Sequence, residues 1–280
     1  MTLREITKDG IHYWIGIPQF PVNLYVDYFM ICHGVPEFDQ EYIFPNNEAE
    51  IFFNLADRNF AFGKDENLVQ TFTSTIVSGL RSERLTITPG GIFSLAGVRF
   101  NIFGFYQLFK IPANEFTDRN FDASDVWNRE MLSMHEQLVN ASDTKQRMDL
   151  LERWIKSAID KRDVRDALFW KKITPKLSYT SLPLQDYLSS AMGYSHKHII
   201  QLFKEKCGLA PKMIQRVFRF NSVLIRAVEQ SCVNWTSLSH EAGYTDQSHF
   251  IRDFKQFTGF TPLTLRKQRP KDWMLLKESR

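Results

Sequence analysis

Apolar side chains recur at helical spacing in the last hundred residues of the chain, and glycines interrupt them at regular places. Ser181 and Pro183 suit the cap and the first turn of a helix, which Gly193 then ends with a sharp turn. Ser195 is a suitable N-cap for a second helix, and Gly208 suits its C-terminal end. The pattern predicts two short helices joined by a glycine turn. Their apolar positions are Leu182, Leu184, Tyr187, Leu188, Met192, Ile199, Leu202 and Phe203.

The same arrangement occurs again about fifty residues later. Gly193-Tyr194 begins the stretch GYSHKHIIQLFKEKCGLAP, and Gly243-Tyr244 begins GYTDQSHFIRDFKQFTGFTP. Internal repetition indicates a repeated structural unit, and helix, glycine turn and helix together are typical of a helix-turn-helix. We therefore expect two such units, at about 182–208 and 235–259. The apolar positions of the second unit are Trp235, Leu238, Ala242, Phe250 and Phe254.

The segment between the two copies predicts one continuous helix from Pro211 to about Glu229. Nineteen residues at the α-helical rise make a rod of roughly 28 Å. Successive major-groove faces on one side of B-DNA are about 34 Å apart, so such a rod can hold two recognition helices near that separation. Arg216, Arg219 and Arg226 line the rod, where they suit phosphates or acidic partners within the same domain.

The second helix of each unit carries a polar and largely basic face opposite its apolar stripe. In the first unit this face comprises His196, Lys197, Ile200, Gln201 and Lys204. In the second unit it comprises Gln247, Ser248, Ile251, Arg252 and Lys255. Two such faces favour DNA binding. Helix-turn-helix shapes also occur in helical proteins that touch no DNA, so a protein-interaction or structural role is the alternative function.

Charge is divided unevenly along the chain. The 280 residues hold 35 Lys and Arg against 32 Asp and Glu, a net charge of +3. Residues 1–165 hold 17 basic and 23 acidic side chains, a net of −6, while residues 166–280 hold 18 and 9, a net of +9. Basic charge concentrated in one part of a chain is expected of a phosphate-binding domain.

Residues 163–270 resemble the DNA-binding module of the AraC/XylS family of bacterial transcription regulators. The resemblance rests on both Gly-Tyr turns, both Phe-Lys pairs (Phe203-Lys204 and Phe254-Lys255) and both Gly-x-x-Pro endings. It implies a seven-helix module that inserts two helices into adjacent major-groove segments of double-stranded DNA. Carried over by position, the base-contacting residues would be Lys197, Ile200, Gln201, Gln247, Ser248, His249 and Arg252.

The chain departs from the family pattern at two positions. Gln201 stands where an arginine is common, which puts guanine readout by the first unit in doubt. Asp253 occupies a position that is usually apolar, so we expect looser packing of the second recognition helix. The resemblance also admits further partners, namely RNA polymerase, a small-molecule effector and a second copy of the chain.

The N-terminal part is rich in β-branched and aromatic residues separated by turns. Strands are predicted at Glu50–Leu55, Thr71–Val77, Leu85–Thr88 and Ile92–Phe100, with Pro89-Gly90-Gly91 as a turn. Helical spacing follows. One helix, opened by Ser124, is marked by Val126, Trp127, Met131, Met134, His135 and Leu138. Another is marked by Leu150, Leu151, Trp154, Ile155 and Ala158.

We therefore expect an α+β protein with two domains. A mixed β-barrel or sandwich with trailing helices occupies residues 1–160, and an all-helical double helix-turn-helix domain occupies residues 161–280. The first domain resembles an N-terminal domain of unassigned function that precedes AraC-type modules in other regulators. In the family at large this position holds a sensor and dimerisation domain, so the resemblance implies that role here.

Arg99 is the candidate ligand-binding residue of the N-terminal part. It lies between Val98 and Phe100 in a predicted strand, and an inward-pointing guanidinium needs an anionic partner. That partner is either a carboxylate of the protein, which we favour, or a ligand.

The sequence lacks the motifs of common catalytic and phosphate-binding sites. There is no glycine-rich phosphate loop, no Gly-x-Ser-x-Gly and no His-Glu-x-x-His, so we expect neither an enzyme nor a cofactor. Cys32, Cys207 and Cys232 are odd in number and widely spaced, which favours free thiols over disulfides or a metal site. No apolar run reaches the roughly 18 residues of a membrane span, and no secretory signal begins the chain. We expect a cytoplasmic, nucleoid-associated protein.

Overall fold

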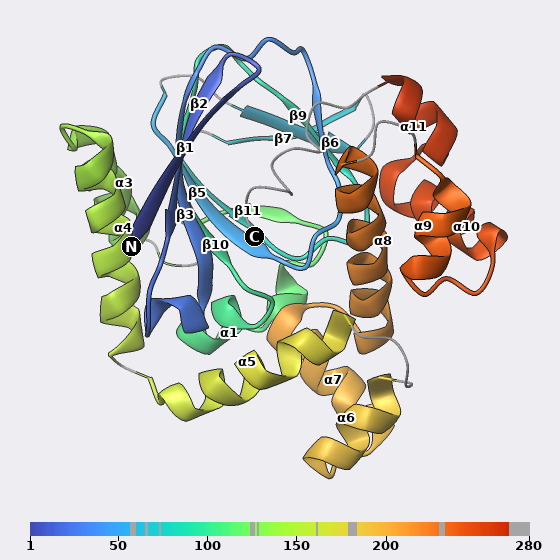
Figure 1. Ribbon diagram of the computed structural model, residues 1–280. Helices are drawn as coiled ribbons and strands as arrows, with labels where there is room; N and C mark the ends of the chain where they lie inside the picture. Colours follow the sequence, from blue (N-terminus) through green and yellow to red (C-terminus); the bar gives the residue numbers. More distant parts are fainter. Residues whose placement is uncertain are drawn as a thin grey trace.

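The computed structural model describes residues 1–56, 60–64, 67–72, 74–123, 127, 129–160, 162–178, 184–229 and 233–268. Strands dominate the first part of the chain and helices the second (Figure 1). None of the helices in these ranges is long and apolar enough to cross a membrane. The α+β class expected from the sequence is confirmed.

Two open antiparallel sheets form the N-terminal part, rather than one closed barrel. The larger sheet has the strand order β1-β2-β3-β10-β5-β8-β11, and the smaller sheet has the order β4-β9-β6-β7. The strands of the larger sheet are β1 (Thr2–Lys8), β2 (Ile11–Ile17), β3 (Val26–Gly34), β5 (Ala49–Asn54), β8 (Thr75–Ser78), β10 (Phe93–Phe100) and β11 (Asn120–Asp122). Those of the smaller sheet are β4 (Glu41–Ile43), β6 (Phe60–Lys64), β7 (Asn67–Phe72) and β9 (Leu85–Thr88).

The larger sheet separates two cores because its side chains alternate between its faces. On β3, Phe29 and Ile31 belong to a core shared with the helices, whereas Met30 and Cys32 belong to a second core. That second core also contains Ile87 of β9, so it lies between the two sheets. The N-terminal part is therefore layered as helices, larger sheet and smaller sheet.

The helices that cover the larger sheet are α1 (Gly104–Phe109), α3 (Arg129–Asn140) and α4 (Thr144–Ile159), with the short 3-10 turns η1 (Val22–Leu24) and η2 (Ala113–Glu115). Figure 1 shows α3 and α4 side by side along the sheet. Trp154 of α4 meets Phe53 of β5 edge-on, with ring centroids 6.1 Å apart. Both helices occupy segments where helical spacing predicted them, although Ser124 and Val126 lie outside the described residues.

One predicted strand is wrong. The segment Thr71–Val77 is not a single strand: its first residues end β7, and its last residues lie in β8. These two strands belong to different sheets. Continuous β-propensity along a segment does not reveal that the chain leaves one sheet for the other.

The helical part comprises α5 (Val164–Ser178), α6 (Leu184–Met192), α7 (His196–Cys207), α8 (Pro211–Glu229), α9 (Trp235–Glu241), α10 (Gln247–Thr258) and α11 (Pro262–Gln268). Its first helices share a core with the strand part. Phe103 lies 4.2 Å from Trp170 of α5 and 5.6 Å from Phe203 of α7, measured between ring centroids. The core is thus continuous across the expected boundary at residues 160 and 161, from the larger sheet to the first helix-turn-helix unit.

Candidate nucleic-acid interface

Two helix-turn-helix units of the same build lie along α8. The first, α6 and α7, lies at one end of α8, and the second, α9 and α10, lies beside its other half (Figure 1). The turns contain Gly193 at φ +69° and Gly243 at φ +81°, which glycine adopts at little cost. The helix α8 runs from Pro211 to Glu229, as the sequence predicts.

The second helix of each unit is capped at its N-terminus by a side chain. The Ser195 hydroxyl accepts a hydrogen bond from the backbone N–H of His198 at 3.3 Å, so the predicted cap is confirmed. Asp246 is the N-cap of α10: its Oδ1 accepts a hydrogen bond from the backbone N–H of His249 at 2.7 Å. This hydrogen bond holds the pKa of the Asp246 carboxyl below its ordinary value. The Ser181 cap and Pro183, predicted for the preceding helix, lie outside the described residues.

Each recognition helix has one buried face and one exposed face. Ile199 and Phe203 are fully buried on α7, as are Phe250 and Phe254 on α10. Both stripes match the apolar pattern, because residues three and four apart share one face of a helix. The side chains left exposed are those of His196, Lys197, Gln201, Lys204, Gln247, Ser248, Arg252 and Lys255.

Four residues on or beside the two predicted faces are half-buried or contact another side chain of the protein. Ile200 and Ile251 are half-buried. His196 is exposed and lies 3.0 Å from Asp186 of α6, measured from Nε2 to Oδ1. His249 is half-buried, and its ring packs edge-on against Tyr244 with centroids 5.2 Å apart.

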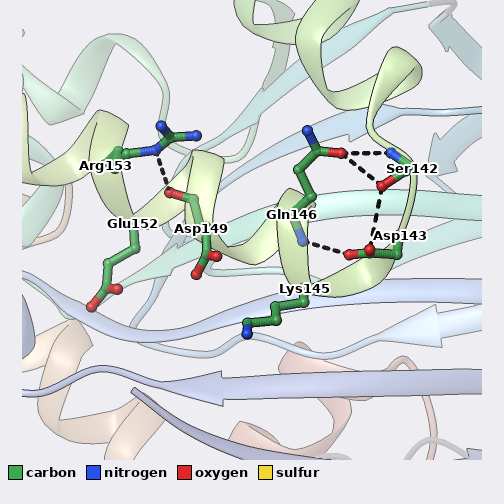
Figure 2. A pocket seen from close by; sticks show the side chains of 7 residues that line it. All are labelled: Ser142, Asp143, Lys145, Gln146, Asp149, Glu152 and Arg153. Carbon is green, nitrogen blue, oxygen red and sulfur yellow. Dashed lines mark hydrogen bonds between the residues drawn. The ribbon is translucent and has the colours of Figure 1, made fainter.

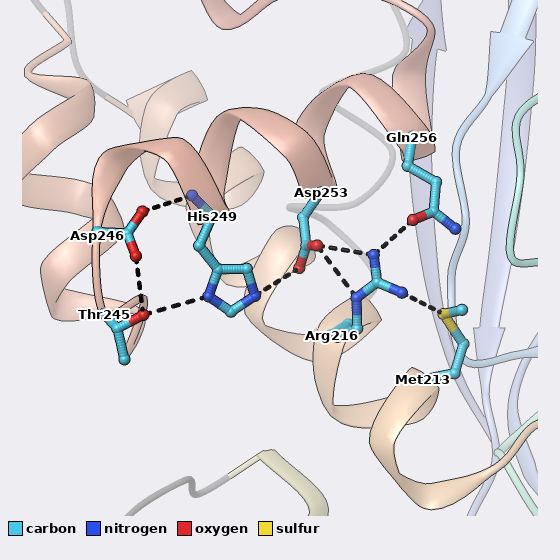
Figure 3. Close-up of polar contacts among 7 residues, drawn as sticks. All are labelled: Met213, Arg216, Thr245, Asp246, His249, Asp253 and Gln256. Carbon is cyan, nitrogen blue, oxygen red and sulfur yellow. Dashed lines mark hydrogen bonds and ion pairs between the residues drawn. The ribbon is translucent and has the colours of Figure 1, made fainter.

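Asp253 connects α10 to α8. It is almost fully buried, and its Oδ1 accepts hydrogen bonds from Arg216 Nη2 at 2.7 Å and Nε at 3.1 Å. His249 Nε2 lies 3.8 Å from the other carboxylate oxygen, and His249 Nδ1 lies 3.4 Å from the Thr245 hydroxyl (Figure 3). The buried carboxylate therefore has a charged partner across the interface, and the looser packing expected of this helix stays a prediction.

The remaining arginines of α8 also have partners inside the module. Arg226 Nη1 lies 2.8 Å from Glu241 of α9, and the Arg219 guanidinium stacks over the Tyr244 ring at 5.2 Å. Of the two roles that the sequence left open for these arginines, Arg216 and Arg226 therefore take acidic partners in the same domain. Burial raises the pKa of the Tyr244 hydroxyl.

The N-terminal part contacts the C-terminal end of both recognition helices. The Thr117 hydroxyl donates to the Gly208 carbonyl at 3.0 Å, and Arg84 Nη1 donates to the Thr258 carbonyl, next to Gly259, at 3.1 Å. Both glycines end their helices in the left-handed conformation. Sequence reasoning predicted the glycine at Gly208 but missed both partners, which lie 91 and 174 residues away along the chain.

Two further contacts join the N-terminal part to the second unit. The Arg84 guanidinium lies over the rings of Tyr42 and Phe260, at 5.0 and 4.9 Å from their centroids. Phe44 meets Phe220 of α8 edge-on at 6.3 Å and belongs to the core of the second unit. The second unit is thus docked through a few side chains, whereas the first is joined through a continuous core.

Arg99 has carboxylate partners within the protein. Its guanidinium forms ion pairs with Glu48, at 3.1 Å, and with Glu50, and it stacks over the Tyr28 ring. The nearby carboxylates raise the pKa of the Arg99 guanidinium despite its burial. Glu48 and Glu50 also line a cavity of about 40 Å³. That volume suits a water molecule or two.

Two other features have structural explanations. A hollow of about 470 Å³ lies over the start of α4, where Gln146 N donates to Asp143 at 2.8 Å and Ser142 N donates to the Gln146 side chain at 2.6 Å (Figure 2). This reciprocal pair is a helix cap. Cys32 and Cys207 are buried free thiols. The residues that the structure describes contain no group of three or more His, Cys, Asp and Glu side chains that could hold a metal ion.

Two family models match the chain in separate parts. One, described as a helix-turn-helix domain, matches residues 188–268, and the other, a domain of unknown function named DUF6597, matches residues 17–122. No curated protein matches the chain.

Solved structures of ToxT from Vibrio cholerae are similar over most of both chains. ToxT of strain O395 is 14% identical, with a TM-score of 0.42, and the match covers 86% of this chain and 94% of that one. ToxT of the same strain bound to (E)-4-(8-methylnaphthalen-1-yl)but-3-enoic acid is 16% identical, with a TM-score of 0.42 and coverages of 85% and 95%. Likenesses this distant do not identify a shared function. The helix-turn-helix match agrees with the resemblance to AraC-type modules seen in the sequence, and the chain therefore carries a helix-turn-helix domain behind an N-terminal DUF6597 domain.

Proposed function

We propose that the chain binds specific DNA sequences and regulates transcription. The observation that carries this proposal is the duplicated unit: α7 and α10 each have a side-chain N-cap, a glycine C-cap, a buried apolar stripe and an exposed polar face. The net charge of +9 over residues 166–280 also supports a polyanionic partner.

The length of α8 sets the geometry of the proposed complex. Its 19 residues span roughly 28 Å, which is near the 34 Å or so that separates successive major-groove faces. One chain is therefore proposed to occupy two major-groove segments about one turn apart on the same side of the DNA.

The residues predicted to contact DNA divide into two proposed roles. Base edges would be contacted by Lys197, Ile200, Gln201, Gln247, Ser248, His249 and Arg252. Phosphates would be contacted by His196, Lys204 and Lys255. Arginine can pair bidentately with guanine, and an aliphatic side chain such as Ile200 can contact the thymine methyl group.

DNA spacing tests the two-unit model. A binding site is first selected from random-sequence DNA with the purified full chain, and five base pairs are then inserted between its two halves. The insertion rotates one half to the opposite face, so we expect a large loss of affinity in a gel-shift titration. A site that binds equally well after the insertion would contradict the model. Equal binding of selected and unrelated DNA would favour the alternative, a helical interaction protein.

Two substitutions test the division of roles. Arg252→Ala is expected to weaken the selected site by roughly 1–3 kcal/mol and to relax the preference at one base position. Lys204→Ala is expected to weaken all sequences alike and to lower the salt slope by about one phosphate contact. Lys145→Ala, an exposed lysine on α4, is the matched control and should change neither property. Uniform losses for both Arg252→Ala and Lys204→Ala would contradict the assignment.

The N-terminal domain is proposed to govern the DNA-binding module in response to a small molecule or a partner. Its contacts with Gly208 and Thr258 support this, because they join it to the C-terminal ends of both recognition helices. A ligand shifts such an equilibrium only when its affinity differs between the two states. An effector should therefore change affinity for the selected DNA and, by linkage, be bound differently when that DNA is present. RNA polymerase and a second copy of the chain remain proposed partners.

A further inference from the structure

A groove of about 730 Å³ lies between the two helix-turn-helix units. Its walls come from the start of α6, one side of α8 and the inner side of α10. Figure 3 shows part of this wall, where Arg216, His249 and Asp253 meet. The charged side chains that line it are Lys212, Arg216, Arg219, Arg252 and Asp253.

The groove has an excess of positive charge. Arg216 is compensated by Asp253 and also donates to Gln256 at 2.5 Å. Lys212, Arg219 and Arg252 form no ion pair with a carboxylate among the residues that the structure describes. Three positive charges from two helices therefore face one space, which attracts an anionic ligand.

Arg219 also offers a hydrogen-bond donor that the protein leaves unused. Its guanidinium stacks over Tyr244, and within the described part of the chain its buried Nε has no acceptor. A buried donor without an acceptor is costly, and because this atom has almost no accessible surface, a ligand in the groove would reach it only if the side chain moved.

We propose that this groove binds the phosphate backbone of the DNA segment between the two sub-sites. The proposal rests on the proposed function and adds a third contact region, on α8, to the two recognition helices. The charges of Lys212 and Arg219 both come from the linking helix and lie between the units, whereas Arg252, on the α10 side of the groove, keeps its proposed contact with a base. A single inorganic anion would use only a small part of a 730 Å³ groove. This contact is independent of sequence and serves to align the units on the duplex.

Uncharged DNA linkages test the proposal directly. The selected site is made with methylphosphonate linkages in the spacer only, and its affinity for the full chain is compared with that of unmodified DNA. At 0.1 M salt we expect binding to be about eightfold weaker for each phosphate contact that is lost, because each contact contributes about 0.9 to the salt slope. Lys212→Gln, at an exposed position, should reduce this sensitivity to the neutral spacer and keep the base preference. Arg219→Gln should act in the same way, whereas Lys145→Gln on α4 should behave like the unsubstituted chain.

The outcomes separate this inference from the proposed function. Failure to prefer the selected site over unrelated DNA would overturn both. Normal site preference with no effect of the neutral spacer would overturn the groove alone. Equal sensitivity to the neutral spacer in Lys212→Gln and the unsubstituted chain would also overturn it, since the phosphates would then be held elsewhere. The neutral spacer could have no effect while calorimetry shows binding of inorganic pyrophosphate that Lys212→Gln abolishes. In that case the ligand of the groove would be a small anion rather than DNA.

Discussion

The contact between Arg84 and the end of α10 can be broken by adding a single methyl group. Gly259 has a φ of +78°, and a Cβ built there lies 2.7 Å from Arg84 Nη1 and 2.9 Å from its Cζ. In Gly259→Ala the Arg84 guanidinium must move away, because the alanine Cβ and the guanidinium cannot share that space. Gly193 is the matched control: its φ of +69° is similar, but nothing lies within 4 Å of its Cβ position.

The expected loss of stability has two parts. An alanine in the left-handed region costs about 1 kcal/mol at either glycine. Displacing Arg84 also removes its 3.1 Å hydrogen bond to the Thr258 carbonyl and its stacking over Tyr42 and Phe260. In this half-buried place we assign about 1 kcal/mol to the hydrogen bond and about 1 kcal/mol to the stacking. We therefore expect about 3 kcal/mol for Gly259→Ala and about 1 kcal/mol for Gly193→Ala.

A double-mutant cycle measures the coupling. The free energy of unfolding is obtained from urea titrations followed by circular dichroism for Gly259→Ala, Arg84→Ala and the double variant. Because Arg84→Ala already removes the contact, adding Gly259→Ala to it should cost only about 1 kcal/mol, a coupling of about 2 kcal/mol. Additive losses would refute the contact. Equal losses in Gly259→Ala and Gly193→Ala would do the same.

Three further predictions concern buried groups. Asp253→Ala should lower the free energy of unfolding by about 3 kcal/mol, because Arg216 then keeps a largely buried charge without its partner; a loss under 1 kcal/mol would contradict this. Arg99→Met should lower the free energy of unfolding by about 3 kcal/mol, because the buried Glu50 is then left without its ion-pair partner; a loss under 1 kcal/mol in urea titrations would argue against it. Burial raises the pKa of the Cys32 thiol to about 12 from 9.0, so iodoacetamide at pH 8 should label it about a thousandfold more slowly in the folded than in the urea-unfolded chain, and similar rates would count against the buried thiol.

The local parts of the DNA-binding module could be predicted from the sequence. The extent of α8, the cap at Ser195 and the left-handed glycines at Gly193 and Gly208 all follow from residues a few positions apart. Helix propensity, capping and turn geometry act over that range, so they leave a pattern that can be read without knowing the fold. The internal repeat supports the prediction of two helix-turn-helix units, because the same local pattern occurs twice.

The tertiary structure alone decided which side chains meet. The sequence places Asp253 in an apolar stripe without a partner, and only the fold puts Arg216 opposite it. The sequence allows Arg99 a ligand or a carboxylate, and only the fold puts Glu50 beside it. No sequence pattern around Arg84 predicts its contact with the end of α10, which lies 174 residues away along the chain. Such contacts depend on the path of the whole chain, and pairs far apart in sequence leave no periodic pattern. The physical reason is that backbone preferences are settled within a few residues, whereas buried charges take whichever partner the finished fold brings within reach.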